Sequence, residues 1–297
     1  MRKLVVDTDI GSDVDDAFAV LLVLASPEVD LAAITLVHAN LDVRARIAAK
    51  LLALAGRMEV PIYKGMSETL SRKRRLYWAG NEGAGLDLDG TEAVRVETGG
   101  VEKIVELAGK HGPDLALAPI GPMTNIAAAI QAAPDVMRGI GRLYVMASVL
   151  QGVGEAAAGR EHNVNCDPEA AQVVFSSGIP ITLVGLNVTM KVWLTGRFVD
   201  SMKGRTLLGD YMALMAEKFF EAIGRRMTYM HDPLAVASIL EPSLLKTERY
   251  RAEVLTEGED SGKTVFWGDG EPKLDVAVDV DVEAFDKLFQ PRVMSLI

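Results

Sequence analysis

The stretch KLVVDTDIGSDVDDAFAVLLVLA, residues 3–25, joins two apolar runs through an acidic segment. Residues 3–7 form a short segment with β-branched valines, which predicts a buried strand. The apolar run over residues 15–25 predicts a helix. Residues 8–14 would then form the loop at the carboxyl end of a parallel strand, where open α/β sheets bind ligands. Five carboxylates fall in this segment: Asp7, Asp9, Asp13, Asp15 and Asp16.

The rest of the chain extends this strand–loop–helix pattern. Further strands are predicted at residues 31–37, 114–119, 143–147 and 180–186, and helices at 43–55, 122–132, 168–175, 207–224 and from 232 onward. Residues 67–100 look like a long excursion from the sheet. Alternating segments at 252–256, 264–267 and 274–281 predict a small antiparallel addition near the C-terminus. We therefore expect an α/β fold with an open, mostly parallel sheet flanked by helices, forming a single domain over residues 1–297.

Composition narrows the classes of function. The chain has 297 residues and a formal net charge of -10, which argues against a nucleic-acid partner because tracking phosphates needs a basic face. The apolar run at residues 17–25 is far shorter than a bilayer span, so no membrane partner is expected. The single cysteine, Cys166, excludes an internal disulfide framework. Three apolar residues before Asp7 are too few for a signal-peptide core, and we predict a cytoplasmic protein.

The acidic segment favours a cation site. One Asp at a helix start can cap free N–H groups, but five unpartnered carboxylates would repel one another. A bound cation removes this conflict, and oxygen ligands suit Ca²⁺ or Mg²⁺. An EF-hand is disfavoured. If Asp7 is the first position of the loop, Ser12 stands where an EF-hand has its turn glycine, and Phe18 stands where it has its bidentate Glu. A Mg²⁺-dependent phosphatase with an aspartyl nucleophile in Asp7-Thr8-Asp9 remains an alternative, although it gives Asp15-Asp16 no role.

Five segments together resemble the inosine-uridine preferring nucleoside hydrolase family. They are DTDIGSDVDDA (7–17), ITLVHANLD (34–42), APIGPMTNIAAAI (118–130), REHNVNCDPEAA (160–171) and HDPLAVA (231–237). They run in family order from residue 4 to about 285, so the likeness covers nearly the whole chain. The acidic turn is two residues longer than the commoner family form. The resemblance implies a Rossmann-like nucleoside hydrolase fold and the release of a free base and ribose from a ribonucleoside.

The resemblance also implies a Ca²⁺ site. Its ligands would be Asp9, Asp16, Asp232 and the carbonyl of Ile120, all hard oxygen donors. Asp9 would be the general base that takes a proton from a Ca²⁺-bound water as it attacks the anomeric carbon. For Asp232 the alternative is a plain helix cap, because Asp precedes Pro there. We expect Asp7 to support the loop rather than bind the ion.

Residues that hold the substrate follow from the same likeness. Asp15 would accept a hydrogen bond from the ribose 2′-hydroxyl, and Met146 would also contact the substrate. Asn40, Glu161 and Asn163 would hold the 3′ and 5′ hydroxyls. His231 would protonate the departing base. The alternatives are an ordinary turn residue for Asn40 and surface polar groups for Glu161 and Asn163.

Departures from the family pattern surround the base and the 5′ position. Ala79-Gly80 stands where many members have His-Gly, and Glu155 stands where some have an Asn that contacts the ribose. Asn187 and Met190 replace an Asp and a His. The resemblance therefore supports the reaction more strongly than it supports a particular substrate. A non-catalytic family member that binds Ca²⁺ or a riboside remains an alternative. The family suggests a homodimer or homotetramer; the preferred base and any 5′ substituent stay open.

Overall fold

The computed structural model describes residues 1–78, 80, 82–150, 159–272 and 274–297. Its strands are β1 Arg2–Thr8, β2 Val29–Leu36, β3 Ile62–Lys64, β4 Val96–Thr98, β5 Leu115–Pro119, β6 Arg142–Met146, β7 Ile181–Val184, β8 Trp193–Thr195, β9 Met227–Tyr229, β10 Leu245–Val254, β11 Thr264–Trp267 and β12 Leu274–Val280. Its helices are α1 Asp15–Leu24, α2 Leu41–Leu54, α3 Gly100–His111, α4 Thr124–Ala132, α5 Pro134–Arg138, α6 His162–Cys166, α7 Pro168–Phe175, α8 Leu186–Thr189, α9 Gly196–Met202, α10 Leu207–Ile223, α11 His231–Leu240 and α12 Val282–Met294.

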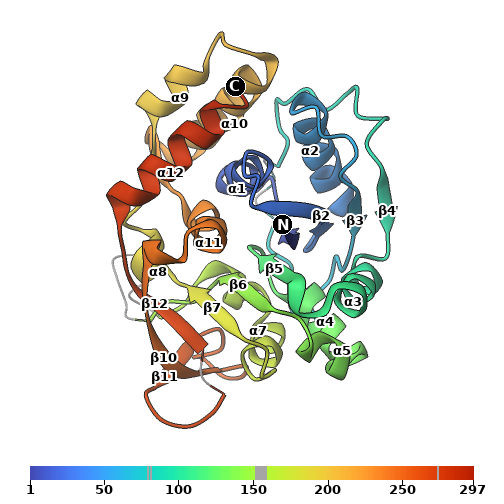
Figure 1. Cartoon of the computed structure of the whole chain (residues 1–297), viewed down its shortest axis with the longest axis vertical. Helices are drawn as coiled ribbons and strands as arrows, with labels where there is room; N and C mark the ends of the chain where they lie inside the picture. The colour runs from blue at the N-terminus through green and yellow to red at the C-terminus, as the bar shows by residue number, and fades with distance from the viewer. Residues whose placement is uncertain (79, 81, 151–158, 273) are drawn as a thin grey trace.

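Ten strands form the central sheet, in the order β11-β10-β12-β7-β6-β5-β1-β2-β3-β4 (Figure 1). Every pairing from β12 to β4 is parallel, whereas β10 and β11 pair antiparallel at one edge. Strands β8 and β9 form a separate antiparallel pair. The predicted fold class, a mostly parallel sheet with a small antiparallel addition, is confirmed. Because β1 lies inside the sheet, the loop that follows it is flanked by the loops after β5 and β2.

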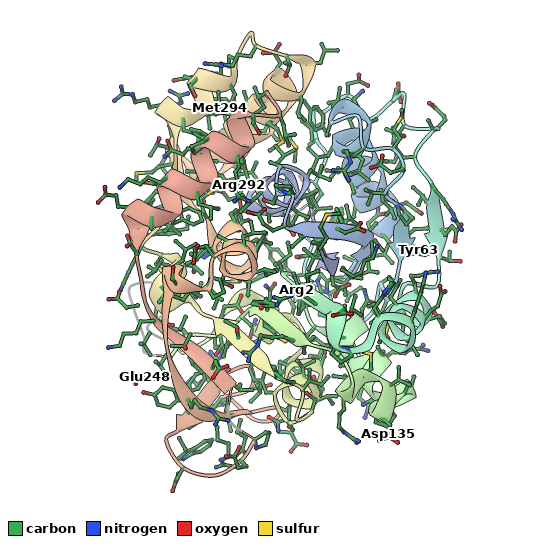
Figure 2. All side chains as sticks on the ribbon, in the orientation of Figure 1. Arg2, Tyr63, Asp135, Glu248, Arg292 and Met294 are labelled. Carbon is green, nitrogen blue, oxygen red and sulfur yellow. The ribbon has the colours of Figure 1, made fainter. Side chains whose placement is uncertain are left out.

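Two apolar layers enclose the sheet, and alternation along β1 divides its side chains between them. Leu4 and Val6 pack in one cluster with Phe18 of α1, while Val5 packs in the other with Ile126 of α4. Helices α1, α2, α10, α11 and α12 contribute to the first cluster, and α3, α4 and α7 to the second. Side chains fill the space between sheet and helices (Figure 2). This burial of both faces is typical of parallel sheets.

The C-terminal strands differ from the prediction in extent and role. Strand β12 pairs in parallel with β7, so it belongs to the main sheet and links it to the antiparallel β10. Strand β10 begins at Leu245, seven residues before the predicted start at residue 252. Its first half is mostly exposed, so no apolar alternation marks it in the sequence.

Several elements escaped prediction. Strands β3 and β4 are three residues each, too short to show a period, and β4 lies inside the supposed excursion at residues 67–100. Helices α3 and α12 also add to the predicted set. Among the described residues no helix has the length and apolarity needed to cross a membrane.

Candidate active site

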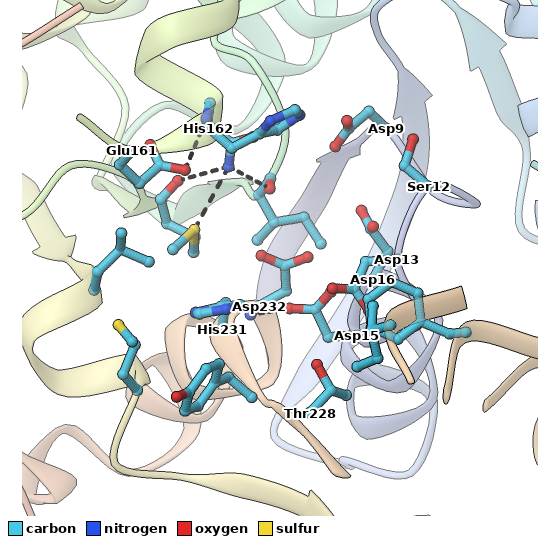
Figure 3. A pocket seen from close by; sticks show the side chains of 18 of the residues that line it. Asp9, Ser12, Asp13, Asp15, Asp16, Glu161, His162, Thr228, His231 and Asp232 are labelled. Atoms are coloured by element: carbon cyan, nitrogen blue, oxygen red, sulfur yellow. Dashed lines mark hydrogen bonds between the residues drawn. The ribbon is translucent and has the colours of Figure 1, made fainter. Parts of the chain in front are cut away.

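A cavity of about 420 Å³ opens at the carboxyl ends of the central strands (Figure 3). The loops after β1, β5 and β6 and the first turns of α1, α6 and α11 supply its walls. All but one of the predicted site residues line it: Asp9, Asp15, Asp16, Ile120, Met146, Glu161, Asn163, His231 and Asp232. Segments more than 200 residues apart in the sequence, the acidic turn and the start of α11, therefore meet in one pocket.

An acidic trio forms part of the pocket wall. One carboxylate oxygen from each of Asp15, Asp16 and Asp232 lies within 4.8 Å of the others, and all three residues are buried. Neither Asp15 nor Asp232 is the N-cap of its own helix, since Val14 and Met230 occupy those positions. Asp15 Oδ2 does accept a hydrogen bond from the N–H of Asp232 in the first turn of α11, at 3.1 Å. The positive ends of two helix dipoles point toward the trio, which favours negative charge there but does not neutralise it.

The three buried carboxylates of the trio repel one another. Burial raises the pKa of Asp16 well above its usual range, and the neighbouring carboxylates of Asp9 and Asp15 raise it further. Burial and the charge of Asp15 act in the same direction on the pKa of Asp232. A divalent cation between these oxygens would reverse both effects, since it favours the ionised form. The donor set is all oxygen, which fits Ca²⁺ or Mg²⁺ and is a poor match for Zn²⁺.

Asp9 also lines the pocket but lies outside this trio. Its side chain is buried, and one carboxylate oxygen is 3.8 Å from the guanidinium Nη2 of Arg44. The resemblance assigned Asp9 to the ion and Asp15 to the sugar, whereas the structure gathers Asp15 with Asp16 and Asp232. The roles of Asp9 and Asp15 stay predictions.

Asp7 lies beneath the loop, fully buried. It accepts hydrogen bonds from Thr35 Oγ1 at 2.5 Å and from Asn125 Nδ2 at 2.7 Å. Asn125 in turn accepts from the N–H of Met66 at 2.7 Å, so it ties three segments together. Burial raises the pKa of Asp7 to about 7. These contacts agree with the predicted supporting role; Asn125 was not singled out, although it belongs to the quoted segment at 118–130.

The opposite wall carries the residues predicted to hold the sugar. Glu161 is the N-cap of α6 and accepts hydrogen bonds from the N–H groups of Ser148, Asn163 and Val164 at 2.7–3.1 Å. The Asn163 amide donates to the carbonyl oxygens of Ile120 at 2.8 Å and Met146 at 3.0 Å. Both side chains are buried, so they are not the surface polar groups of the alternative reading.

Asn40 is not brought to this pocket. Its side chain is exposed and caps α2 by accepting a hydrogen bond from the N–H of Val43 at 3.2 Å. This placement matches the ordinary turn residue that was the alternative to ribose contact. Its predicted sugar contact has no support in this geometry.

His231 faces the remaining part of the cavity. Its Nδ1 lies 2.7 Å from Thr189 Oγ1, and its ring centroid is 5.5 Å from that of Tyr229. Burial lowers the pKa of His231 to about 4, so the ring is neutral near pH 7. Apolar and aromatic side chains that the sequence did not single out complete this region: Leu186, Phe219, Ile223 and Tyr229.

The departures from the family pattern divide between pocket and scaffold. Met190 lines the cavity, whereas the Asn187 amide donates to the carbonyl of Ala277 at 2.8 Å, away from it. Ala79 and Glu155 lie outside the described residues. Cys166 is buried 3.5 Å from His162 Nε2, and burial raises the pKa of its thiol, which disfavours a thiolate nucleophile.

Comparison with known proteins shows which family has this architecture. The inosine-uridine preferring nucleoside hydrolase model matches residues 4–287. A probable uridine nucleosidase 2 of Arabidopsis thaliana is 31% identical and covers 99% of this chain and 98% of its own length.

Two solved structures share the fold over nearly all of both chains. A plant nucleoside hydrolase superposes with a TM-score of 0.87 at 27% identity, covering 98% of each chain. A purine-preferring ribonucleoside hydrolase from Gardnerella vaginalis superposes with a TM-score of 0.85 at 30% identity, covering 99% of each. The match extends from β1 into α12 and includes every segment that forms the pocket, and the chain therefore belongs to the inosine-uridine preferring nucleoside hydrolase family.

Proposed function

We propose that this protein is a Ca²⁺-dependent hydrolase that cleaves the N-glycosidic bond of ribonucleosides to give a free base and ribose. The observation that carries the proposal is the buried trio Asp15, Asp16 and Asp232 beside a fourth carboxylate, Asp9, in one pocket. Family membership supports a hydrolase acting on N-glycosyl compounds. The identity of the ion and the roles of single residues are the proposed part.

The carboxylates of Asp16 and Asp232 would hold the cation, and an oxygen of Asp15 lies within 4.8 Å of theirs. Asp9 and the carbonyl of Ile120, residues that line the same pocket, are proposed as further ligands. Ca²⁺ accepts six to eight oxygen ligands at flexible angles, which suits a site built from carboxylates and a backbone carbonyl. When bound, the ion would orient vicinal sugar hydroxyls and increase the acidity of the attacking water.

Asp9 would act as the general base. It would accept a proton from the attacking water while the water oxygen bonds to the anomeric carbon and the bond from that carbon to the base nitrogen breaks. Its place outside the trio leaves a carboxylate oxygen available for this proton. Asp15 would accept a hydrogen bond from the 2′-hydroxyl, and Glu161 and Asn163 would orient the rest of the ribose.

His231 would face the departing base. A neutral imidazole with Thr189 at Nδ1 can present an Nε2–H to a base nitrogen or carbonyl, provided that the threonine hydroxyl donates to Nδ1. This hydrogen bond would ease departure by stabilising negative charge on the base. If the proton were on Nδ1, Nε2 would have no hydrogen to donate to the base. The proposal therefore requires the tautomer of His231 that is protonated on Nε2.

The choice of base stays open between purines and pyrimidines. The named relatives differ, one being a uridine nucleosidase and another purine-preferring. The apolar wall of Leu186, Phe219 and Ile223 accepts either ring system by stacking and contact alone. From the resemblance we also propose a cytoplasmic homodimer or homotetramer.

A sugar-dependence experiment tests the proposal. Ribonucleosides and their 2′-deoxy counterparts would be compared by release of reducing sugar, with the same base in each pair. We expect the deoxy compound to be slower by about a hundredfold or more in kcat/KM, since the pocket's polar groups lose their hydroxyl partner. Equal rates would contradict the proposed sugar contacts; no turnover of any nucleoside with retained Ca²⁺ binding would favour a binding protein, and phosphate release from esters a phosphatase.

A further inference from the structure

A buried arginine lies directly behind the acidic turn. Arg44 of α2 has no exposed surface, which is rare for a charged side chain. Its guanidinium donates from Nε to the carbonyl of His38 at 2.8 Å and from Nη1 to the carbonyl of Ile10 at 3.0 Å. Among the described residues, Asp9 is the one carboxylate within 4 Å of the guanidinium, and its distance of 3.8 Å is beyond direct hydrogen bonding. Arg44 is therefore held mainly by backbone carbonyls, in a forked geometry that lysine cannot reproduce.

The same side chain contacts two further segments at the pocket edge. Both Nη atoms lie within 3.4 Å of Ser12 Oγ, and Ser12 donates to Glu82 Oε1 at 3.2 Å. The other oxygen of Glu82 accepts from the N–H of Gly80 at 2.8 Å. The guanidinium also lies over the Trp78 ring, 5.3 Å from its centroid. Arg44, Ser12 and Glu82 thus connect the acidic turn to Trp78 and Gly80.

These two segments border the cavity. Asp9 and Ser12 line it from the acidic turn, and Tyr77, next to Trp78, lines it from the other segment. Gly11 in the turn lies so close to α2 that a Cβ there would approach Ile47 Cδ1 to 2.6 Å. The acidic turn therefore packs directly on α2 at Gly11 and is held there by the fork of Arg44.

We propose that Arg44 is a positioning residue, which acts through Ser12 and Glu82 to hold the acidic turn, Trp78 and Gly80 in the geometry that binds the cation and the nucleoside. The proposal rests on the proposed function for its substrate. A simple counter-charge would need only a cation near Asp9. A positioning residue needs the fork, because the guanidinium reaches three residues at once, His38, Ile10 and Ser12. The two roles separate in the variant Arg44→Lys, which keeps the charge and loses the fork.

The experiment compares Arg44→Lys, Arg44→Met and Ser12→Ala with the wild type. Ca²⁺ affinity is measured by calorimetry and tryptophan emission by fluorescence, and neither readout needs turnover. Both Arg44 variants should weaken Ca²⁺ binding by about tenfold and shift emission to the red as Trp78 is released, because small displacements of positioned groups are costly. Ser12→Ala should raise the nucleoside KM by about threefold or more with kcat within about twofold, since it removes a link and leaves the charge in place.

Two controls locate the effect. Arg46→Met removes an arginine of the same helix whose one ion pair within the described part of the chain is with exposed Asp89, and it should leave affinity, emission and KM unchanged. In a Trp78→Phe background the red shift on changing Arg44 should vanish, although two other tryptophans remain.

Wild-type Ca²⁺ affinity and emission in Arg44→Lys, or tighter Ca²⁺ binding in Arg44→Met, would overturn the proposal in favour of a pure charge effect. If both Arg44 variants fail to fold, Ser12→Ala decides, and an unchanged KM with unchanged emission overturns it. A protein that hydrolyses no nucleoside would sink the proposed function instead, while Ca²⁺ affinity and emission would still decide the role of Arg44.

Discussion

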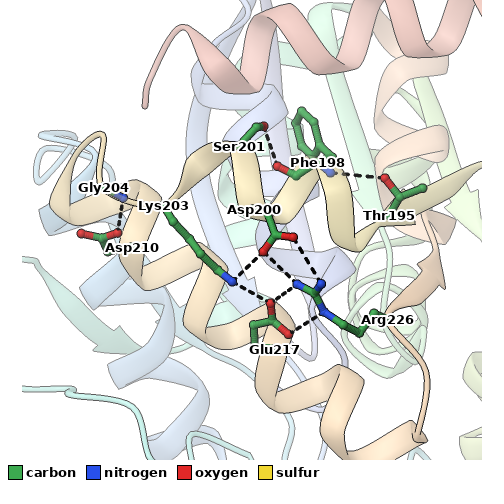
Figure 4. A network of polar contacts seen from close by, with 9 residues as sticks. All are labelled: Thr195, Phe198, Asp200, Ser201, Lys203, Gly204, Asp210, Glu217 and Arg226. Atoms are coloured by element: carbon green, nitrogen blue, oxygen red, sulfur yellow. Dashed lines mark hydrogen bonds and ion pairs between the residues drawn. The ribbon is translucent and has the colours of Figure 1, made fainter.

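Two clusters of charged side chains in this protein have opposite designs. The pocket trio of Asp15, Asp16 and Asp232 is buried and carries one sign of charge. The surface network of Asp200, Lys203, Glu217 and Arg226 joins α9, α10 and the segment before β9 and carries both signs (Figure 4).

The difference lies in whether each cluster is complete. In the network, Lys203 contacts Asp200 at 2.7 Å and Glu217 at 2.8 Å, and Arg226 contacts the same two acids, so each charge has opposite neighbours within the protein. Such exposed pairs contribute little to stability. Among the described residues no ion pair joins a member of the trio to a Lys or Arg side chain, and burial raises the pKa of each member. A buried cluster of one sign lowers the stability of the metal-free protein, and in a pocket it is a candidate functional site.

The largest effect should come from removing a member of the trio. Asp16→Asn should reduce turnover by about a thousandfold or more and weaken Ca²⁺ binding greatly, because the amide lacks the charge that attracts the ion. Without metal, the same variant should be more stable than the wild type, since it relieves repulsion. Steady-state kinetics, calorimetry and thermal melting check the three effects.

Glu217→Gln is the matched control, because it is the same type of change in the self-neutralising network. It should leave turnover and Ca²⁺ affinity at wild-type values and change the melting temperature little. A loss of activity in this variant comparable to that of Asp16→Asn would erase the distinction between the two clusters.

The next effect should separate chemistry from metal binding. Asp9→Asn should lower kcat by about a hundredfold or more, as expected on losing a general base, while Ca²⁺ affinity stays within about threefold of wild type. Its position outside the trio is the reason for this split. Wild-type rates would remove Asp9 as the base, and a parallel loss of metal would make it a ligand first.

A smaller effect should appear in stability as a function of pH. The raised pKa of Asp7, about 7 against an ordinary 3.8, means that the metal-free folded state holds a proton that the unfolded chain releases. Metal-free stability should therefore fall as pH rises from about 4 to 7, by up to about 1.4 kcal/mol per pH unit for each such group, and level off above 7. The raised pKa values of Asp16 and Asp232 act in the same direction.

Urea unfolding with chelator and with saturating Ca²⁺, at pH 5 and pH 8, measures this dependence. The stabilisation by Ca²⁺ should be larger at pH 8, where the ion no longer competes with protons for the carboxylates. An equal stabilisation at both values would show that these carboxylates do not titrate with the metal site.

The sequence predicted most of the parts of this site but not how they combine. The strand, loop and helix over residues 3–25 depend on neighbouring residues, so the apolar pattern and the acidic turn could be recognised in the sequence. The five quoted segments, which occur in the order typical of the family, supported the family assignment. Which carboxylates come close together depends on contacts between distant segments. Asp15 and Asp232 meet because α1 packs on α11. Asn40 shows the limit of a motif, because the structure shows its side chain as the cap of α2 and its ribose contact stays a prediction.

Arg44 was missed for a related reason. An arginine on a predicted helix is ordinarily exposed, and nothing near it in the sequence indicates that its partners are carbonyls of residues 10 and 38. The pairing depends on the packing of α2 against the acidic turn, which only the three-dimensional arrangement reveals.

The central claim is that the trio needs a cation to act on ribonucleosides. The most direct measurement is release of reducing sugar from a panel of purine and pyrimidine ribonucleosides, first with chelator and then after adding Ca²⁺ back. The account predicts turnover that the chelator abolishes and Ca²⁺ restores with at least one nucleoside. Turnover that persists at full rate in chelator, with metal content below one ion per hundred chains or so, would contradict it.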